Sequence, residues 1–119
     1  MYMISHPGKK LIFMGGEIGQ FIEWRDDREI DWLLLEYENH QQLQKFNADL
    51  NHFYLEHSEF YERDDNWSGF EWLNADDKDR NIFTYKRRNN LEEEIRIFSK
   101  ELEGGIEGFL EIFNNSNNE

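Results

Sequence analysis

Residues 9–20, with the sequence KKLIFMGGEIGQ, constrain the fold more than any other stretch of this chain. Residues 11–14 are all apolar, and Gly15 and Gly16 end the run. A short apolar run between turn signals is typical of a strand that is buried on both faces, as in parallel sheets and barrels. So short a run is not a stable helix by itself. We therefore expect a buried strand at 11–14, followed by a sharp turn.

Glu17 comes directly after this turn. In α/β folds the carboxyl end of a strand is where ligands and catalytic groups sit, so Glu17 is a candidate site residue. The alternative interpretation is a Gly-Gly turn followed by a solvated glutamate, and these residues alone leave both interpretations open.

The charge balance limits the partners that the chain can bind. The formal net charge is −13, and the isoelectric point is near 4.6. Such a surface repels phosphate backbones and anionic lipid, which argues against nucleic acid and membrane partners. It is compatible with a neutral partner, such as a sugar polymer, in the cytoplasm.

Redox and metal chemistry find little support in the sequence. The chain has no cysteine, which excludes disulfides, thiolate catalysis and zinc–thiolate sites. The acidic stretch at 76–79 suggests a calcium loop at first sight. Counted from Asp77, however, Ile82 stands where such a loop needs glycine, and Arg88 where it needs glutamate. We therefore expect no metal and no cofactor.

No apolar run approaches the roughly 20 residues that a membrane span requires. The first residues, MYMISHPGKK, lack the basic-then-apolar order of a signal peptide. Residues 1–5 resemble the end of a helix whose beginning is missing, so we expect the chain to be cut from a longer protein.

The connection at residues 15–38 fits neither helical nor strand periodicity. It contains Trp24, Trp32 and the charge cluster at 25–29. Tryptophans beside charged groups suit sugars, because the ring stacks on a pyranose while the polar groups bind its hydroxyls. The alternative is that both tryptophans fill gaps in a core and that the charges pair on the surface.

Regular elements are predicted further along. Residues 39–57 carry an apolar helical face, with Asn39 as the expected N-cap and Gln42 as its capping-box partner. Residues 58–69 are the expected boundary. Residues 70–73 and 82–86 alternate with period two and predict a β-hairpin whose long tip spans 74–81. Residues 91–102 fit either a strand or a helix.

Residues 3–88 resemble the glycogen (1,4-α-glucan) branching enzymes of the α-amylase superfamily. The motifs that carry the resemblance occur in the family's order: HPGKKLIFMGGEIGQ at 6–20, EW at 23–24, REIDWLLLEY at 28–37, LQKFNADLNHFY at 43–54 and GFEWLNADD at 69–77. Such an ordered set is highly specific. After Arg88 the resemblance fades, because EIRIFSKELEGG departs from the family pattern.

The resemblance implies an α+β arrangement. Residues 1–62 would be the last strand, loop and helix of a catalytic (β/α)8 barrel. Residues 63–119 would be the first antiparallel strands of an incomplete carboxyl-terminal β-sandwich. The implied reaction transfers an α-1,4 glucan chain to a 6-hydroxyl. The family's catalytic Asp, Glu and Asp lie on earlier strands, so this chain would carry no catalytic residue and would be inactive alone.

The same resemblance names substrate-binding candidates. Glu17 matches the family motif after the eighth barrel strand, and Trp24, Arg25 and Asp26 lie in the loop nearest bound glucan. The expected partners are an α-glucan and the rest of the enzyme chain, and the exposed barrel strand suggests self-association. The alternative function is a non-catalytic module that binds glucan or another protein.

Overall fold

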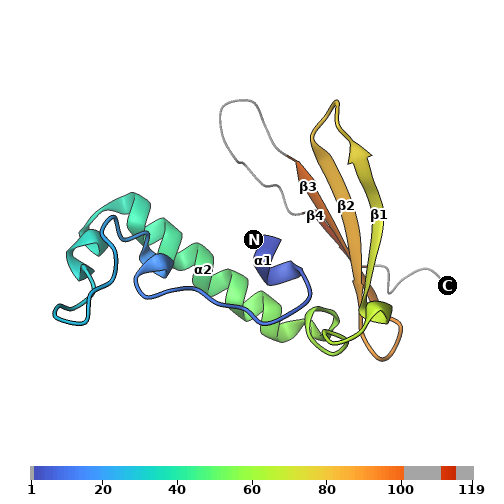
Figure 1. The fold of residues 1–119 in the computed structure, drawn as a ribbon, viewed down its shortest axis with the longest axis horizontal. Coiled ribbons are helices and arrows are strands. Elements are labelled where there is room, and N and C mark those ends of the chain that lie inside the picture. Colours follow the sequence, from blue (N-terminus) through green and yellow to red (C-terminus); the bar gives the residue numbers. More distant parts are fainter. Residues whose placement is uncertain (1, 101–110, 115–119) are drawn as a thin grey trace. The chain divides into compact units, whose positions relative to one another are not determined.

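The computed structural model describes residues 2–100 and 111–114. The chain divides into two compact units (Figure 1). The sheet unit contains residues 1–8 and 54–119, and the loop unit contains residues 9–53.

The sheet unit is an antiparallel meander. Its strands are β1 (Phe70–Asp77), β2 (Ile82–Arg88), β3 (Glu94–Lys100) and β4 (Glu111–Asn114), which pair in that order (Figure 1). The short helix α1 (Tyr2–Ser5) and the 3₁₀ turns η3 (Ser58–Phe60) and η4 (Trp67–Gly69) belong to the same unit. The outcome is an α+β fold, as expected. The barrel end and the β-sandwich remain predictions.

One face of the sheet carries the core of this unit. Trp72 lies opposite Tyr85, and Tyr85 lies opposite Ile97. Tyr85 is 0% exposed and Ile97 is 1% exposed. The α1 helix supplies Ile4, which is buried, and Ser5, whose hydroxyl hydrogen-bonds the Tyr85 hydroxyl. Burial raises the pKa of Tyr85, and this outweighs the lowering effect of the hydrogen bond with Ser5.

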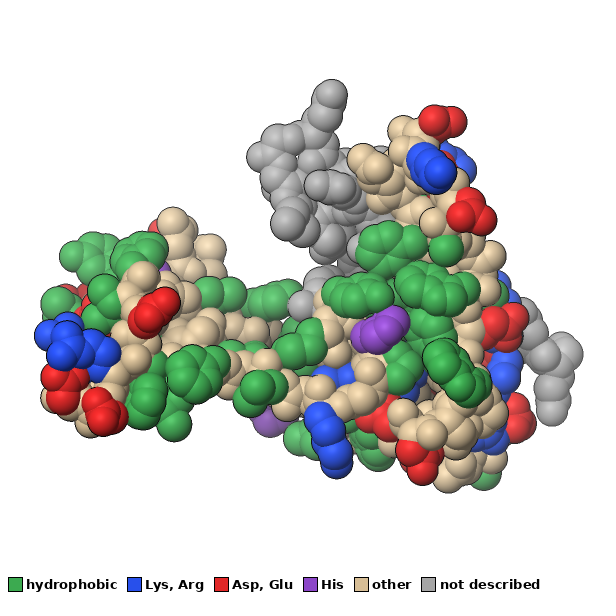
Figure 2. Space-filling model, viewed as in Figure 1, with side chains coloured by type: hydrophobic (Ala, Val, Ile, Leu, Met, Phe, Trp, Pro, Cys, Tyr) green, Lys and Arg blue, Asp and Glu red, His purple; other side chains and the backbone are tan. Residues whose placement is uncertain are grey.

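Aromatic rings continue this apolar face toward solvent. The His6 ring lies edge-on to Phe70 at 5.0 Å, and the Tyr2 ring lies edge-on to Phe83 at 5.7 Å. Figure 2 shows hydrophobic side chains, with a histidine among them, gathered over this part of the sheet unit. The alternation of residues along β1 and β2 therefore sorts aromatic side chains onto one face, as the sequence predicts.

The opposite face of the sheet is charged. The Lys86 ammonium lies 3.0 Å from a Glu94 carboxylate oxygen and 3.2 Å from Glu71. The Arg88 guanidinium lies 2.7 Å from Glu94. Partial burial raises the pKa of Glu94, but the hydrogen bonds from Arg88 and Lys86 outweigh it and hold that pKa below its usual range.

Arg87 is the exception on the buried face. It lies opposite Ile95 on β3, and its side chain is 0% exposed. Its guanidinium donates hydrogen bonds to the carbonyl oxygens of Gly69 at 3.1 Å, Ser5 at 2.9 Å and Phe60 at 2.9 Å. It also pairs with Asp64 at 2.6 Å. One side chain thus joins α1, η3, η4 and β2.

The predicted hairpin is confirmed, but its tip is shorter than expected. Residues 74–77 belong to β1, with Asn74 opposite Thr84 and Asp77 opposite Ile82. The register shifts on either side of Asn74. This polar stretch extends the strand because pairing with β2 satisfies its backbone groups. Of the two interpretations of residues 91–102, the strand is confirmed for 94–100 by β3, where Ile95 and Ile97 are buried, while residues 101 and 102 lie outside the described residues.

The loop unit contains η1 (Gly16–Ile18), η2 (Trp32–Glu36) and most of the helix α2 (Glu38–Glu56). The predicted helix is confirmed within a residue at each end. The predicted capping box is wrong, because Asn39 lies inside the helix. Gln42 instead donates a side-chain hydrogen bond to Glu38 at 3.0 Å. Among the described helices, α2 included, none combines the length and apolar character needed to cross a membrane.

The expectation of a buried strand at 11–14 is wrong for this structure. These residues form neither strand nor helix, and their side chains are 39–75% exposed. The physical reason is the lack of a partner: every strand of the described ranges belongs to the sheet unit, so nothing in the loop unit completes a ladder with them.

Candidate functional site

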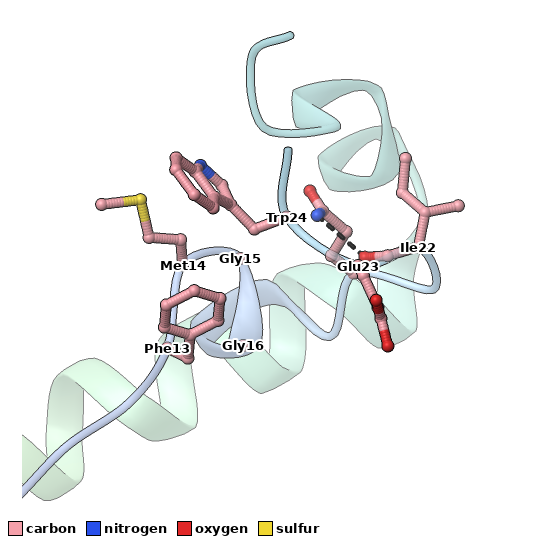
Figure 3. A pocket seen from close by; sticks show the side chains of 8 residues that line it. Phe13, Met14, Gly15, Gly16, Ile22, Glu23 and Trp24 are labelled. Carbon is pink, nitrogen blue, oxygen red and sulfur yellow. Dashed lines mark hydrogen bonds between the residues drawn. The ribbon is translucent and has the colours of Figure 1, made fainter. Parts of the chain in front are cut away.

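A pocket of about 390 Å³ lies within the loop unit, at the end of the apolar run. Its lining consists of Phe13, Met14, Gly15, Gly16, Gln20, Ile22, Glu23 and Trp24. Figure 3 shows Phe13, Met14 and Trp24 to one side of the Gly15–Gly16 turn in that view, and Ile22 and Glu23 to the other. The volume falls in the range of roughly 300–1,000 Å³ that is usual for small-molecule sites.

The floor of the pocket depends on a glycine that no other residue replaces without strain. Gly15 has φ of 86°, in the left-handed region, and is the N-cap of η1. A Cβ atom at this position would lie 2.9 Å from the Gln20 side-chain carbon. The two glycines of the motif thus make a tight turn whose backbone faces the pocket without side chains.

Gln20 braces the loop around the pocket. Its backbone N–H donates to the Gly15 carbonyl at 3.0 Å, and its side-chain amide donates to the Ile22 carbonyl at 3.0 Å, drawn as a dashed line in Figure 3. Its side-chain oxygen accepts a hydrogen bond from the Asp31 N–H at 2.8 Å. This role of Gln20 was not predicted from the sequence. The one local sign of it is that an amide side chain, with both a donor and an acceptor, directly follows the glycine-rich stretch 15–19.

The η1 turn is fixed to α2. Asn47 donates its side-chain N–H to the Glu17 carbonyl at 2.9 Å, and the His40 ring donates to the Ile18 carbonyl at 2.7 Å. Gly19 has φ of 70° and lies so close to Leu43 that a Cβ atom would come within 2.8 Å of it. These positioning residues were not predicted from the sequence, because they lie far from η1 along the chain.

An aromatic pair forms one wall of the pocket. The Phe13 and Trp24 rings meet edge to face, with centroids 5.9 Å apart and an interplanar angle of 84°. Trp24 is 38% exposed, and Trp32 is 50% exposed. The interpretation that both tryptophans fill core gaps is therefore wrong. An apolar ring face beside a carboxylate, Glu23, and bare backbone polar groups is a typical arrangement for sugar recognition.

The structure brings only one of the predicted site residues to the pocket. Trp24 lines it, whereas Glu17, Arg25 and Asp26 do not. Glu17 is half-buried on η1, and Asp26 is exposed. Arg25 forms a bidentate ion pair with Asp27, with distances of 2.8 and 2.5 Å, so part of the charge cluster pairs on the surface as the alternative interpretation holds. The binding roles of all four residues remain predictions.

No metal site stands out. Within residues 2–100 and 111–114, the structure has no group of three or more histidine or carboxylate side chains placed to hold a metal ion. The pocket itself is lined by aromatic and aliphatic side chains, the Gln20 amide, the Glu23 carboxylate and the backbone of the glycine turn.

Comparison with known proteins identifies the relatives of the chain. No protein-family model matches it. Curated relatives do match. The chain is 49% identical over 88 residues to the 1,4-alpha-glucan branching enzyme GlgB of Halothermothrix orenii. The 88 matched residues cover 74% of this chain and 14% of that enzyme. The chain is 46% identical over 87 residues to the GlgB of Desulfitobacterium hafniense, with 73% of this chain and 14% of the enzyme covered. For GlgB 1 of Clostridium perfringens strain SM101 the identity is 44% over 98 residues, 82% of this chain and 14% of the enzyme.

Each of these relatives is a 1,4-alpha-glucan branching enzyme by name. By its sequence it corresponds to a segment of a 1,4-alpha-glucan branching enzyme, and the resemblance carried by the five motifs is confirmed. The chain spans about 14% of the length of the curated relatives that it matches.

Proposed function

We propose that this chain contributes the end of the catalytic barrel and the start of the following β-domain to a 1,4-α-glucan branching enzyme. Residues 1–62 would supply the last strand, loop and helix of the barrel, and residues 63–119 the first strands of a β-sandwich. The longer enzyme would transfer α-1,4 glucan chains to 6-hydroxyl groups in glycogen biosynthesis, in the cytoplasm. The groups that break and form glycosidic bonds would lie outside this chain.

The observation that carries this proposal is sequence identity of 44–49% over 73–82% of the chain to branching enzymes. A physical observation supports it. Residues 11–14 are apolar yet 39–75% exposed. Apolar runs of this kind are normally covered, and strand neighbours from a longer chain would bury both faces of the run.

The proposed chemistry explains why the chain alone should be inactive. Retaining glycoside chemistry needs a carboxylate nucleophile and a carboxylic acid about 5–5.5 Å apart across the scissile bond. One barrel strand cannot hold such a pair in place, because a barrel closes only with its full set of strands. The role of this chain in catalysis would be to complete the barrel and to bind glucan.

A branching assay tests the proposal directly. The purified chain should leave the iodine absorbance of amylose unchanged. A mixture with a polypeptide that carries the preceding part of the same enzyme should shift that absorbance, whereas either component alone should not. Branching by the chain alone would contradict the proposal, and so would failure of the mixture while the uninterrupted enzyme is active.

The pocket favours a second candidate function, a non-catalytic module that binds glucan or another protein. Retention on immobilised glycogen, without complementation of branching, would support this candidate over the first. The exposed run at 11–14 further suggests that isolated chains associate through it. Sedimentation should then show oligomers that dissociate when Leu11 and Phe13 are replaced by serine.

A further inference from the structure

We propose that Arg87 is a positioning residue for the barrel end of the longer enzyme. It would act by holding Ser5 and Phe60, the chain positions on either side of residues 9–53, in one fixed cluster. The inference rests on the proposed function and deepens it, because it gives the start of the β-domain the task of closing the last segment of the barrel. It concerns the order of the loop unit and assigns no new contact with glucan.

The side chain of Arg87 holds the chain at both positions. Its Nη1 donates to the Ser5 carbonyl at 2.9 Å, and its Nη2 donates to the Phe60 carbonyl at 2.9 Å. Ser5 precedes the loop unit in the chain, and Phe60 follows it. Both nitrogens belong to one planar guanidinium, so the two carbonyls are kept at a fixed spacing. A single buried cation on β2 therefore fixes where the segment 6–59 begins and ends.

The remaining contacts of Arg87 show that it specifies an arrangement. Its Nε donates to the Gly69 carbonyl at 3.1 Å, and its Nη2 lies 2.6 Å from an Asp64 carboxylate oxygen. The groups that Arg87 binds thus come from residues 5, 60, 64 and 69. A well-packed apolar side chain is often as stabilising as a buried ion pair, but it would not specify which groups meet.

Further hydrogen bonds hold both ends of the segment to β2 and the turn after it. At the entry, the Ser5 hydroxyl hydrogen-bonds the Tyr85 hydroxyl. At the exit, the Nδ2 of Asn89 donates to the Ser58 hydroxyl at 3.1 Å. The stretch 58–69, expected to be a domain boundary, is therefore attached to the sheet rather than free.

The loop unit has little core of its own, so its order should depend on closure of its ends. Ile18, which is 0% exposed, and Leu34, which is 9% exposed, are the buried apolar side chains of residues 9–53. A chain segment whose ends are held together has fewer unfolded conformations than one whose ends are free, which stabilises its folded form. Loss of Arg87 should therefore loosen hydrogen bonds of the loop unit that Arg87 does not touch.

Hydrogen exchange of the 119-residue chain, followed by NMR, tests this coupling. The reporters are the amides of Gln20, which donates to the Gly15 carbonyl at 3.0 Å, and Asp31, which donates to the Gln20 side chain at 2.8 Å. In Arg87→Met both amides should exchange about tenfold faster than in the wild type. In Arg87→Lys, which keeps the charge, the increase should be about threefold.

Two controls separate closure of the segment from general stability. Asp64→Asn removes the ion pair and leaves the two end carbonyls bound to Arg87. Ile97→Ala opens a cavity in the same sheet unit, at a side chain that is 1% exposed. Both variants should unfold at lower urea concentrations than the wild type does, yet exchange of the two reporter amides should change by less than about twofold.

The complementation assay tests the positioning role in the reaction. In the mixture with the preceding part of the enzyme, Arg87→Lys should lower kcat for branching about tenfold, because small displacements of a reacting site reduce the rate steeply. KM for amylose should change by less than about twofold, since Arg87 is 0% exposed and cannot touch glucan. Ile97→Ala should leave kcat and KM unchanged.

Faster exchange of both reporters in the Arg87 variants, with the two controls unchanged, supports the inference. If Arg87→Met does not fold, Arg87→Lys decides. Unchanged exchange in Arg87→Lys overturns the inference, and so does equal acceleration in Ile97→Ala, which would mean that Arg87 only stabilises the sheet. An unchanged kcat for Arg87→Lys in a mixture that branches overturns the positioning role. If the wild-type mixture does not branch, the proposed function fails, and the exchange data alone decide whether Arg87 closes the loop unit.

Discussion

Removal of the Arg87 side chain is the most informative perturbation of the sheet unit. Arg87 is 0% exposed, and it donates to three backbone carbonyls while pairing with Asp64. In Arg87→Ala the carbonyls of Ser5, Gly69 and Phe60 lose their donor, and Asp64 keeps a charge without its partner. Removal of one member of a buried ion pair costs about 3–5 kcal/mol.

The exposure of Asp64, the ion-pair partner of Arg87, decides how large the loss of stability in Arg87→Ala is. The Asp64 side chain is 25% exposed, so water recovers part of its solvation when Arg87 is lost. We therefore expect the lower end, about 3 kcal/mol of the free energy of unfolding. With a urea dependence of about 1–3 kcal/mol per M for a small protein, the unfolding midpoint should fall by roughly 1.5 M.

Urea unfolding followed by circular dichroism measures this shift. The matched control is Arg80→Ala in the same hairpin, whose side chain is 71% exposed and pairs with Asp77, which is 12% exposed. Its midpoint should fall much less than that of Arg87→Ala, because the Arg80 guanidinium stays solvated and such a pair contributes little to stability. Arg87→Lys should be intermediate, since an ammonium keeps the charge but not the planar fork. Equal midpoints for Arg87→Ala and Arg80→Ala would refute the reasoning.

Three further predictions concern the same unit. Gly69→Ala should destabilise the fold by about 1–3 kcal/mol in the same urea assay, because a Cβ atom would lie 2.4 Å from the Arg63 carbonyl oxygen. Partial burial raises the pKa of Glu94, but hydrogen bonds from Arg88 and Lys86 outweigh it and hold that pKa below its ordinary value of 4.5 in the folded state. Thermal stability should therefore fall as the pH drops below about 4.5, and Glu94→Gln should flatten that dependence. Burial raises the pKa of Tyr85 above its ordinary value of 10.0, so the stability that the neutral phenol contributes should be fully present below pH 10 and lost as the pH rises further. If the free energy of unfolding of Tyr85→Phe falls with alkaline pH just as that of the wild type does, this prediction is contradicted.

Part of the candidate site could be found from the sequence. The Gly15–Gly16 turn and the exposed Trp24 follow from local residue types, because glycine permits left-handed backbone and tryptophan suits partly apolar ligands. Gln20 could not be assigned in the same way. Its side-chain hydrogen bonds depend on where the loop places the Ile22 carbonyl and the Asp31 N–H, and no sequence pattern specifies the positions of these two groups.

Residues 11–14 show the opposite case. Their composition indicates a buried strand, but a strand is stable only with neighbours, and its partners are not in the loop unit. The expected strand at 11–14 is absent because these residues have no neighbouring strand to pair with, and not because their residue types disfavour a strand.

The sequence by itself determined the resemblance to the branching enzymes, the helix α2, the hairpin of β1 and β2 and the placement of their alternating aromatic residues on one face of the sheet. These features depend on periodicity and on motif order, which are local properties of the chain. Only the tertiary structure decided that Arg87 is buried, that α1 covers the sheet, and that Glu23 rather than Glu17 lines the pocket. The burial of Arg87 and the packing of α1 depend on contacts between residues far apart in sequence, and the pocket lining depends on the path of an irregular loop that no periodic pattern specifies.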